Sequence, residues 1–415
     1  MTKVLGLYID FDLIKTCISI SYMQIHDYKK INSSPQIKPA IDLQANLHSW
    51  IEISRVKMIQ NIQIIKKAIG NAQLGVIIKG NAYGHGIVPV VQILQEVACV
   101  DWVIAFSLTE ALMARQVGFT KKILVCGYAD GLIENAIMHH IDLVLHDTAS
   151  LERYKLAAQK LERPVYVHIK VDTGLNRLGF TPQQALLVIL ELQKSKQLII
   201  RGLFSHFADS DAENNWYAQK QLNDFNKLLD DLAKLQIEIP IIHMANTVAV
   251  FRLSAACKSL VRVAGGVYGL RKTIAPDLIA QDYQQLQPVM TWKSRVIQVR
   301  DLQVGSFVSY GCTFKAEHNM RIATIPVGYA DGYGRELSNN SVIYINGILA
   351  PVVGRVCMNL VIIDVTSAKS VCVGDEVVLL GDIDGVRIFD LMLRLKTIAC
   401  DVTTSLNWTI SRFIV

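Results

Sequence analysis

The chain is organised around residues Val76–Gly86, which read VIIKGNAYGHG. Three apolar β-formers deliver Lys79 to the start of a glycine-rich turn, and a polar, aromatic loop follows. Most lysines lie on solvated faces, but a position at the end of a buried strand predicts a desolvated amine. The chemistry that needs such an amine is Schiff-base formation.

The composition is that of a well-buried globular protein. The 415 residues are 51% hydrophobic and 19% charged, and the formal net charge is +6. Because the lysines and arginines are scattered, we expect no nucleic-acid binding. The sequence has no run of 18 uncharged apolar residues, so we expect no membrane span. The eight cysteines form no CxxC pair, which predicts no metal site and a reducing, cytoplasmic location.

Apolar strands alternate with helical patterns between residues 56 and 264. Near-continuous apolar runs predict parallel strands buried on both faces, at residues 74–78, 102–106, 122–126, 142–146, 165–171, 199–206, 241–245 and 261–264. Helical spacing is evident at residues 56–69, 107–117, 150–161, 182–193 and 216–235. Eight such units over roughly 240 residues predict an α/β fold with a TIM-like (β/α)8 barrel. An open doubly wound sheet is the alternative.

Beyond about residue 285 short alternating strands and glycine turns dominate, which predicts a mostly β domain. The expected strands are 289–299, 307–310, 321–326, 342–344, 352–356, 361–365 and 376–380. Asn346-Gly347 is a hairpin-turn signal. We therefore expect an extension of unknown role at 1–45, a cofactor-binding barrel at 46–285 and a β-rich C-terminal domain at 286–415.

The loops after barrel strands build the active face of such a fold. Polar and cationic residues stand just past the predicted strands, namely Lys79, Tyr83, His85, Lys170, Asp172, Asn176, Arg177, His206, Asp211, Asn246, Thr247, Arg262 and Tyr268. The turn Ala264–Gly266 offers backbone N–H donors for a phosphate. A phosphate cradle and an imine-forming lysine on one rim predict pyridoxal 5'-phosphate as the cofactor.

Seven segments resemble the alanine racemase family, a group of pyridoxal-phosphate enzymes of fold-type III. They read IKGNAYGHG at 78–86, KVDTGLNRLG at 170–179, SHFA at 205–208, HMANT at 243–247, SYGCTF at 309–314, GYADGYGR at 328–335 and GRVCM at 354–358. The segments come in the family's order and spacing between Trp50 and Arg412. The resemblance implies interconversion of L-alanine and D-alanine by two-base proton transfer, which supplies D-alanine for peptidoglycan.

The resemblance also implies a role for each matching residue. Lys79 and Tyr310 would be the catalytic bases, with Tyr310 supplied by the partner in a head-to-tail homodimer. Arg177 and the backbone of Met358 would bind the substrate carboxylate, and Lys170 would carry a carbamate. The cofactor would be held by Lys79, Tyr83, His206, Asn246, Thr247, Arg262, Ala264, Gly265 and Tyr268. A gate would be formed by Tyr329, Asp211, Arg335 and Arg355.

Three positions depart from the family pattern. Thr247 replaces a serine but keeps its hydroxyl, and Asn359 replaces a common aspartate. Cys400 replaces a tyrosine that walls the pocket, which predicts weaker phosphate anchoring or tolerance of larger substrates such as serine. Less favoured hypotheses are a decarboxylase of the same architecture, a single-barrel cofactor-binding protein and a degenerate racemase kept as a scaffold. Arg262, in place of an acidic residue, speaks against the decarboxylase.

Overall fold

The computed structural model describes residues 47–271, 274–368 and 370–415. The predicted extension at 1–45 lies outside them. Within this part of the chain, residues His48–Val415 form one compact unit. No helix among the described residues is long and apolar enough to cross a membrane, and no cluster of three or more His, Cys, Asp or Glu there is arranged to hold a metal ion.

Eight parallel strands form the predicted barrel. They are β2 (Gln73–Ile77), β3 (Trp102–Ser107), β4 (Lys122–Tyr128), β5 (Ile141–Leu145), β6 (Val165–Lys170), β7 (Leu198–Phe204), β8 (Ile241–His243) and β9 (Leu260–Val263). Consecutive strands pair in order, and β2 pairs with both β3 and β9. The Arg262 amide donates to the Ala245 carbonyl oxygen at 3.0 Å and joins β9 to the segment after β8. This closure confirms the barrel and excludes the open doubly wound sheet.

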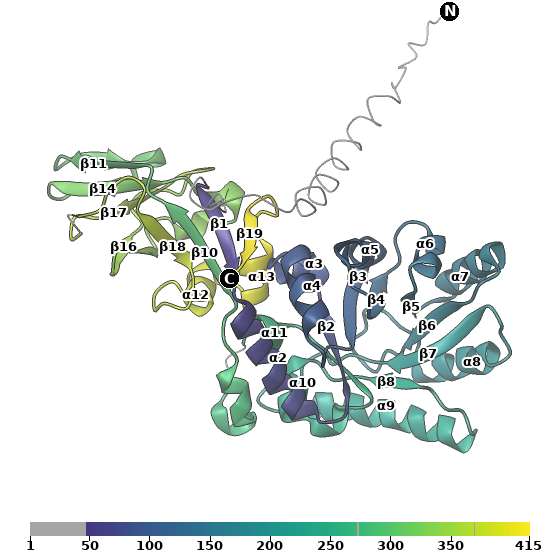
Figure 1. The fold of residues 1–415 in the computed structure, drawn as a ribbon. Coiled ribbons are helices and arrows are strands. Elements are labelled where there is room, and N and C mark those ends of the chain that lie inside the picture. The colour runs from purple at the N-terminus through teal and green to yellow at the C-terminus, as the bar shows by residue number, and fades with distance from the viewer. Residues whose placement is uncertain (1–46, 272–273, 369) are drawn as a thin grey trace, which may run out of the picture. The chain divides into compact units, whose positions relative to one another are not determined.

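Helices cover the outside of the barrel (Figure 1). They are α2 (Arg55–Ile69), α4 (Ile87–Glu96), α5 (Leu108–Val117), α6 (Ile133–Met138), α7 (Thr148–Leu161), α8 (Pro182–Leu192), α9 (Trp216–Lys234) and α10 (Thr247–Arg252). Outward-facing strand residues such as Val167 and Val263 join the core shared with these helices, whereas inward-facing Trp102 and Leu260 belong to a separate cluster. The hydrophobic side chains inside the barrel therefore form a cluster separate from the one between the strands and the helices.

The C-terminal region is mostly β, as predicted. Its strands are β10 (Met290–Arg295), β11 (Gln298–Leu302), β12 (Phe307–Val308), β13 (Phe314–Lys315), β14 (Met320–Ile325), β15 (Val342–Ile345), β16 (Ile348–Pro351), β17 (Val361–Asp364), β18 (Glu376–Leu380) and β19 (Ser411–Ile414), with helices α12 (Ile388–Leu395) and α13 (Ala399–Thr404). Asn346 and Gly347 have positive φ and turn β15 into β16, which confirms the hairpin signal.

Two expected strands were wrong. Residues 289–299 form two strands in different sheets, because Val296 donates its amide to Asp375 whereas Ile297 donates to Thr324. Residues 352–356 form only one bridge, from Val352 to Ile363. Gly354 turns the chain there with φ 78°, and a side chain at that position would meet the Val308 carbonyl oxygen at 2.6 Å.

A strand that the sequence pattern did not reveal links the two regions. Residues Ser49–Ile53 form β1, which pairs antiparallel with β10 and parallel with β19 (Figure 1). The chain thus begins its described part inside the six-stranded sheet of the C-terminal region before it enters the barrel through α2.

Candidate active site

Lys79 begins a left-handed turn at the end of β2. The turn, α3 (Lys79–Tyr83), has φ between 53° and 61° at Gly80, Asn81, Ala82 and Tyr83. Its base is fixed because Gly80 N–H donates to Glu110 and the Asn81 side chain accepts from the Ile87 amide. Lys79 itself is exposed, contrary to the expectation that the strand end alone would desolvate it. Its Nζ atom lies 5.8 Å from the Tyr83 ring centre.

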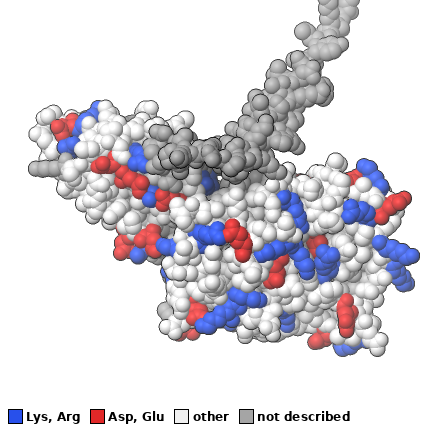
Figure 2. All heavy atoms as spheres, in the orientation of Figure 1, with Lys and Arg blue, Asp and Glu red and all other residues white. Residues whose placement is uncertain are grey.

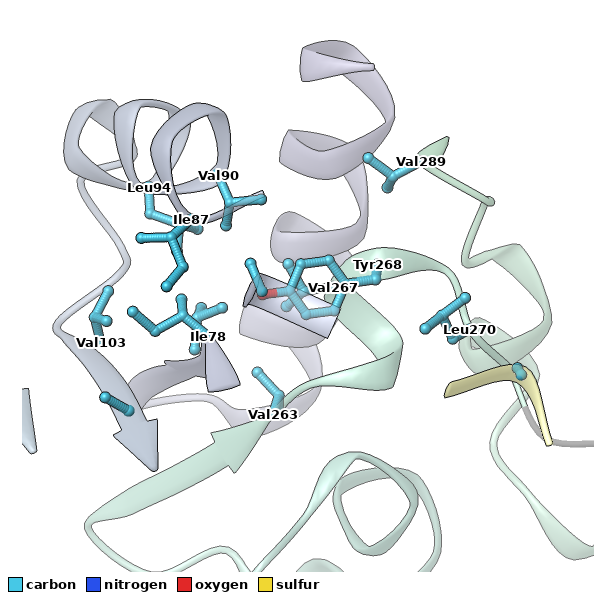
Figure 3. Packing of buried hydrophobic residues seen from close by; sticks show 14 of the residues in the cluster. Ile78, Ile87, Val90, Leu94, Val103, Val263, Val267, Tyr268, Leu270 and Val289 are labelled. Atoms are coloured by element: carbon cyan, nitrogen blue, oxygen red, sulfur yellow. The ribbon is translucent and has the colours of Figure 1, made fainter. Parts of the chain in front are cut away.

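The floor beneath this turn is an apolar cluster. Ile78, Ile87 and Val90 pack there close to Tyr268 from α11 (Gly265–Tyr268), as Figure 3 shows. The Tyr268 hydroxyl donates to the Ile77 carbonyl oxygen at 2.8 Å, and its ring stacks on Tyr83 at 5.4 Å. Burial raises the pKa of both tyrosine hydroxyls. Tyr268 is thus fully buried and supports the turn from below.

Arg262 points into the barrel from β9 and is buried. Its Nη1 lies 2.9 Å from His243 Nδ1, and its Nη2 donates to the Ser205 carbonyl oxygen and lies 3.1 Å from His206 Nδ1. Burial lowers the pKa of Arg262 to about 10, so the guanidinium keeps its charge at neutral pH. A guanidinium only donates hydrogen bonds, so both histidines accept from it.

A glycine-containing turn, Ala264–Gly266, follows the end of β9. Thr247 Oγ1 accepts from the amides of Ala264 at 3.1 Å and Gly266 at 3.4 Å. A side chain at Gly265 would meet the Leu270 carbonyl oxygen at 2.9 Å, so the close approach requires glycine. The Asn246 side chain is engaged elsewhere, because it caps α10 by accepting from the Ala249 amide. The register Val76↔Val263 places this turn beside Lys79.

The charges of four cationic side chains act on His206, which stands past the end of β7. Burial lowers its pKa well below the usual value, and the charges of Arg262, Arg177, Lys170 and Lys79 lower it further. Lys170 is buried at the end of β6, where burial and then the charge of Arg177 lower its pKa to about 8. A rim with this much positive charge suits a ligand carrying a phosphate and a carboxylate.

Arg177 sits on a loop built by Asp172. The Asp172 carboxylate accepts from the amides of Gly174 and Asn176, which closes the loop after β6. Arg177 is exposed, so its guanidinium is accessible to a small anion. Asp211 is half-buried on the loop after β7, where Arg252 donates to the neighbouring carbonyl oxygens of Ser210 and Ala212.

The remaining predicted residues gather in the β region rather than on the rim. Tyr310 is 69% exposed, Met358 56% and Tyr329 41%. Backbone hydrogen bonds join their loops: Ser309 Oγ donates to the Arg355 carbonyl oxygen, and the amides of Tyr329 and Ala330 donate to Cys357 and Met358. Arg335 and Arg355 are also exposed. Among the described residues, no hydrogen bond or ring contact joins Tyr310 to the barrel.

Helix α13 packs against the Lys79 turn, which the sequence pattern did not reveal. A side chain at Gly84 would meet the Thr403 carbonyl oxygen at 1.8 Å, so the two backbones touch there. Cys400 is half-buried on this helix; burial is the main cause of the raised pKa of Tyr83, and the Cys400 thiol, when ionised, would raise it further. A cavity of about 410 Å³ opens beside the turn, lined by residues such as Gly80, Asn81 and Trp408.

Comparison with known proteins identifies two family domains. The alanine racemase N-terminal domain matches residues 53–272, and the alanine racemase C-terminal domain matches residues 289–414. Alanine racemase 1 of Clostridium acetobutylicum is 35% identical over 81% of this chain and 86% of its own length. The alanine racemase of Halothermothrix orenii is 36% identical over 80% and 87%.

Solved structures give the same result. The alanine racemase of Clostridium difficile 630 superposes with a TM-score of 0.83 at 29% identity, over 89% of this chain and 96% of its own. The enzyme from a D-cycloserine-producing Streptomyces lavendulae superposes with a TM-score of 0.82 at 28% identity, over 89% and 97%.

Proposed function

This chain belongs to the alanine racemase family and interconverts L-alanine and D-alanine, and on that premise we propose that Lys79 and Tyr310 are its two bases and pyridoxal 5'-phosphate its cofactor. The proposal depends chiefly on one observation. Arg262 contacts His206 at 3.1 Å, and the charges of Lys79, Lys170 and Arg177 also lower the pKa of His206, so this end of the barrel is strongly cationic. The relatives named above are racemases, which favours racemisation over decarboxylation or a scaffold role.

The residues at the rim fit this cofactor. The Ala264–Gly266 turn and the Tyr83 hydroxyl would hold its phosphate, and Thr247 holds that turn in shape by accepting from the amides of Ala264 and Gly266. Bound there, the cofactor supplies an electron sink that makes the substrate α-proton removable. Arg262 would donate a hydrogen bond to the cofactor's ring nitrogen and could not accept a proton from it, and Lys79 would be the residue that holds the cofactor covalently. His206 and Tyr83 would shape the surrounding wall, whereas Asn246 would act indirectly as the cap of α10 and Tyr268 as the support beneath Tyr83.

Racemisation needs bases on opposite faces of the α-carbon. A single base would return its proton to the face that it came from, so the starting enantiomer would be restored. Lys79 serves one face. Tyr310 serves the other, and its exposure within its own chain suggests that it acts in a neighbouring subunit. We therefore propose a head-to-tail homodimer in which each site combines the Lys79 of one chain with the Tyr310 of the other.

The substrate carboxylate binds to Arg177 and to the backbone N–H of Met358 from the partner. Lys170 has a pKa of about 8, so a fraction of its amine is unprotonated at neutral pH and able to combine with carbon dioxide. The resulting carbamate would be an anion beside Arg177. Tyr329, Arg335 and Arg355, with Asp211 from the facing barrel, form the gate that admits small amino acids. In the cell, the product D-alanine would serve peptidoglycan synthesis in the cytoplasm.

Incubation of the purified protein with L-alanine in deuterium oxide tests this proposal. We expect D-alanine to form with deuterium at the α-carbon, because the proton is exchanged with solvent-derived deuterium on the bases. A protein that binds pyridoxal phosphate but produces neither D-alanine nor α-deuterated alanine would contradict it. Release of carbon dioxide from an amino acid would identify a decarboxylase instead.

A further inference from the structure

A line of polar side chains crosses the interior of the barrel behind Arg262. His243 Nε2 lies 2.9 Å from His168 Nδ1, and His168 Nε2 lies 3.2 Å from Asp142 Oδ2. Arg201 Nη1 donates to both Asp142 oxygens, at 2.6 and 2.9 Å. These contacts, with the 2.9 Å contact between Arg262 and His243, form a continuous row of hydrogen bonds from Arg201 to Arg262.

Burying this row of polar side chains inside the barrel costs free energy, and the neighbouring residues leave space for it. Asp142, His168 and His243 are buried, whereas barrel interiors are normally filled by branched apolar side chains. Gly202 on β7 makes room for it, because a side chain there would meet His168 Nδ1 at 2.2 Å. The His243 ring stacks on Phe204 at 4.7 Å, and the Arg201 guanidinium lies 3.7 Å from the Tyr166 ring centre.

The two ends of the row determine every hydrogen within it. Arg262 can only donate, so His243 Nδ1 must accept and the His243 proton is on Nε2. That Nε2–H donates to His168 Nδ1, so the His168 proton is also on Nε2 and donates to Asp142. Arg201 donates to the same carboxylate from the other side. Burial lowers the pKa of both histidines, which agrees with neutral rings.

We propose that Asp142 and His168 are positioning residues that act on Arg262 through His243. A carboxylate that accepts from His168 makes His168 a better acceptor for His243, which in turn makes His243 Nδ1 a better acceptor for Arg262. Asp142 thereby serves as a remote counter-charge for a buried guanidinium. The effect on catalysis rests on the function proposed above, but the positions of the hydrogens do not.

Histidine ¹⁵N NMR of the holoenzyme tests the hydrogen positions directly. We expect both His168 and His243 to be neutral, with pyrrole-type Nε2 and pyridine-type Nδ1. The signals that disappear in His168→Gln are those of His168. A protonated Nδ1 or a cationic ring at either position would overturn the proposal. This result stands whether or not the protein racemises alanine, so it separates the row of hydrogen bonds from the proposed function.

Asp142→Asn tests the effect on the site. Arg201 needs the remaining carbonyl oxygen, so the new NH2 group faces His168 and reverses both tautomers. His243 then presents an N–H to Arg262. We expect the His243 Nδ1 signal to become pyrrole-type and kcat to fall about tenfold, the rate equivalent of one lost hydrogen bond to a charged group. Unchanged His243 signals in the folded variant would overturn the proposal.

Asp101→Asn is the matched control, because Asp101 accepts only from the backbone amide of Leu74 among the contacts described for it. It should change neither the His243 signals nor kcat. Should Asp142→Asn not fold, a second pair of variants decides. His168→Gln keeps an acceptor for His243 and a donor for Asp142, whereas His168→Leu keeps neither. We expect His168→Gln to retain most of kcat and His168→Leu to lose about tenfold; equal kcat values in the two variants would overturn the proposal.

Discussion

Arg262 sets the chemical character of the rim. Its guanidinium is buried, donates to two histidine nitrogens and keeps its charge, so it presents donors and no acceptor to whatever lies above it. A carboxylate in this place would accept a hydrogen bond from a protonated ring nitrogen, keep that nitrogen protonated and so strengthen the electron sink. The choice of arginine therefore favours an enzyme that moves one proton and suppresses side reactions.

Lys170 shows how a residue's surroundings were only partly predictable from sequence. Its place after an apolar strand indicated the rim, and the structure adds that it is buried with its pKa lowered to about 8. Lys79 stands at the equivalent end of β2 but is exposed. The difference lies in what covers each strand end, which sequence spacing does not contain.

The lowered pKa of Lys170 predicts how stability depends on pH. Between pH 8 and the ordinary value of 10.5, the unfolded lysine binds more proton than the folded one, so the free energy of unfolding rises with pH across that window. Below pH 8 the buried charge costs roughly 3 kcal/mol. Lys170→Met should remove this cost and the rise. Urea unfolding at pH 7.5, 9 and 10 in carbon-dioxide-free buffer measures it, and parallel profiles for the two proteins would contradict the prediction.

The contact between α3 and α13 defines the wall of the site at the level of elements. Gly84 has φ 81° and touches the Thr403 backbone, so a turn near residue 80 and a helix near residue 400 depend on each other. The sequence pattern indicated the glycine-rich turn but not its partner, because α13 is six residues long and has no clear apolar periodicity.

Gly84→Ala should therefore destabilise the fold and the site together. The added methyl group would overlap the Thr403 carbonyl, and we expect a loss of about 2–4 kcal/mol in the free energy of unfolding. Gly118→Ala is the control, since Gly118 is also in the left-handed region but has nothing within 4 Å of the added atom. It should cost about 1 kcal/mol from backbone strain alone. Equal losses in chemical unfolding would show that α13 does not press on the turn.

Substitutions of Cys400, on α13, test the same wall of the site. A tyrosine there would reach further toward Tyr83 than a thiol does, so Cys400→Tyr should slow cofactor loss during gel filtration and lower the rate on serine relative to alanine. Cys400→Ala should behave like the wild type in both assays. If all three proteins lose cofactor at one rate and share one serine-to-alanine ratio, Cys400 has no part in anchoring or selectivity.

At the scale of the whole molecule, Lys and Arg are interspersed with Asp and Glu on the face shown in Figure 2. The exposed cluster around Tyr310, Met358 and Tyr329 is the more informative surface, because large side chains are left uncovered there although their loops are held by hydrogen bonds. The barrel could be predicted from eight apolar runs. The pairing of β1 with β10 and β19 could not, because it joins β1 to segments about 240 and about 360 residues further along the chain.

The central claim is that Lys79 and Tyr310 of different chains make one site. Each variant alone, Lys79→Ala or Tyr310→Ala, should be nearly inactive in racemisation, because each lacks one of the two bases.

Their heterodimer measures the claim most directly. The two variants carry different affinity tags, are produced together and are purified through both tags in turn. Shared sites predict that one site of each heterodimer is intact, with about half of the wild-type racemisation rate. A heterodimer no more active than the separate variants would show that both bases belong to the same chain and would contradict the account.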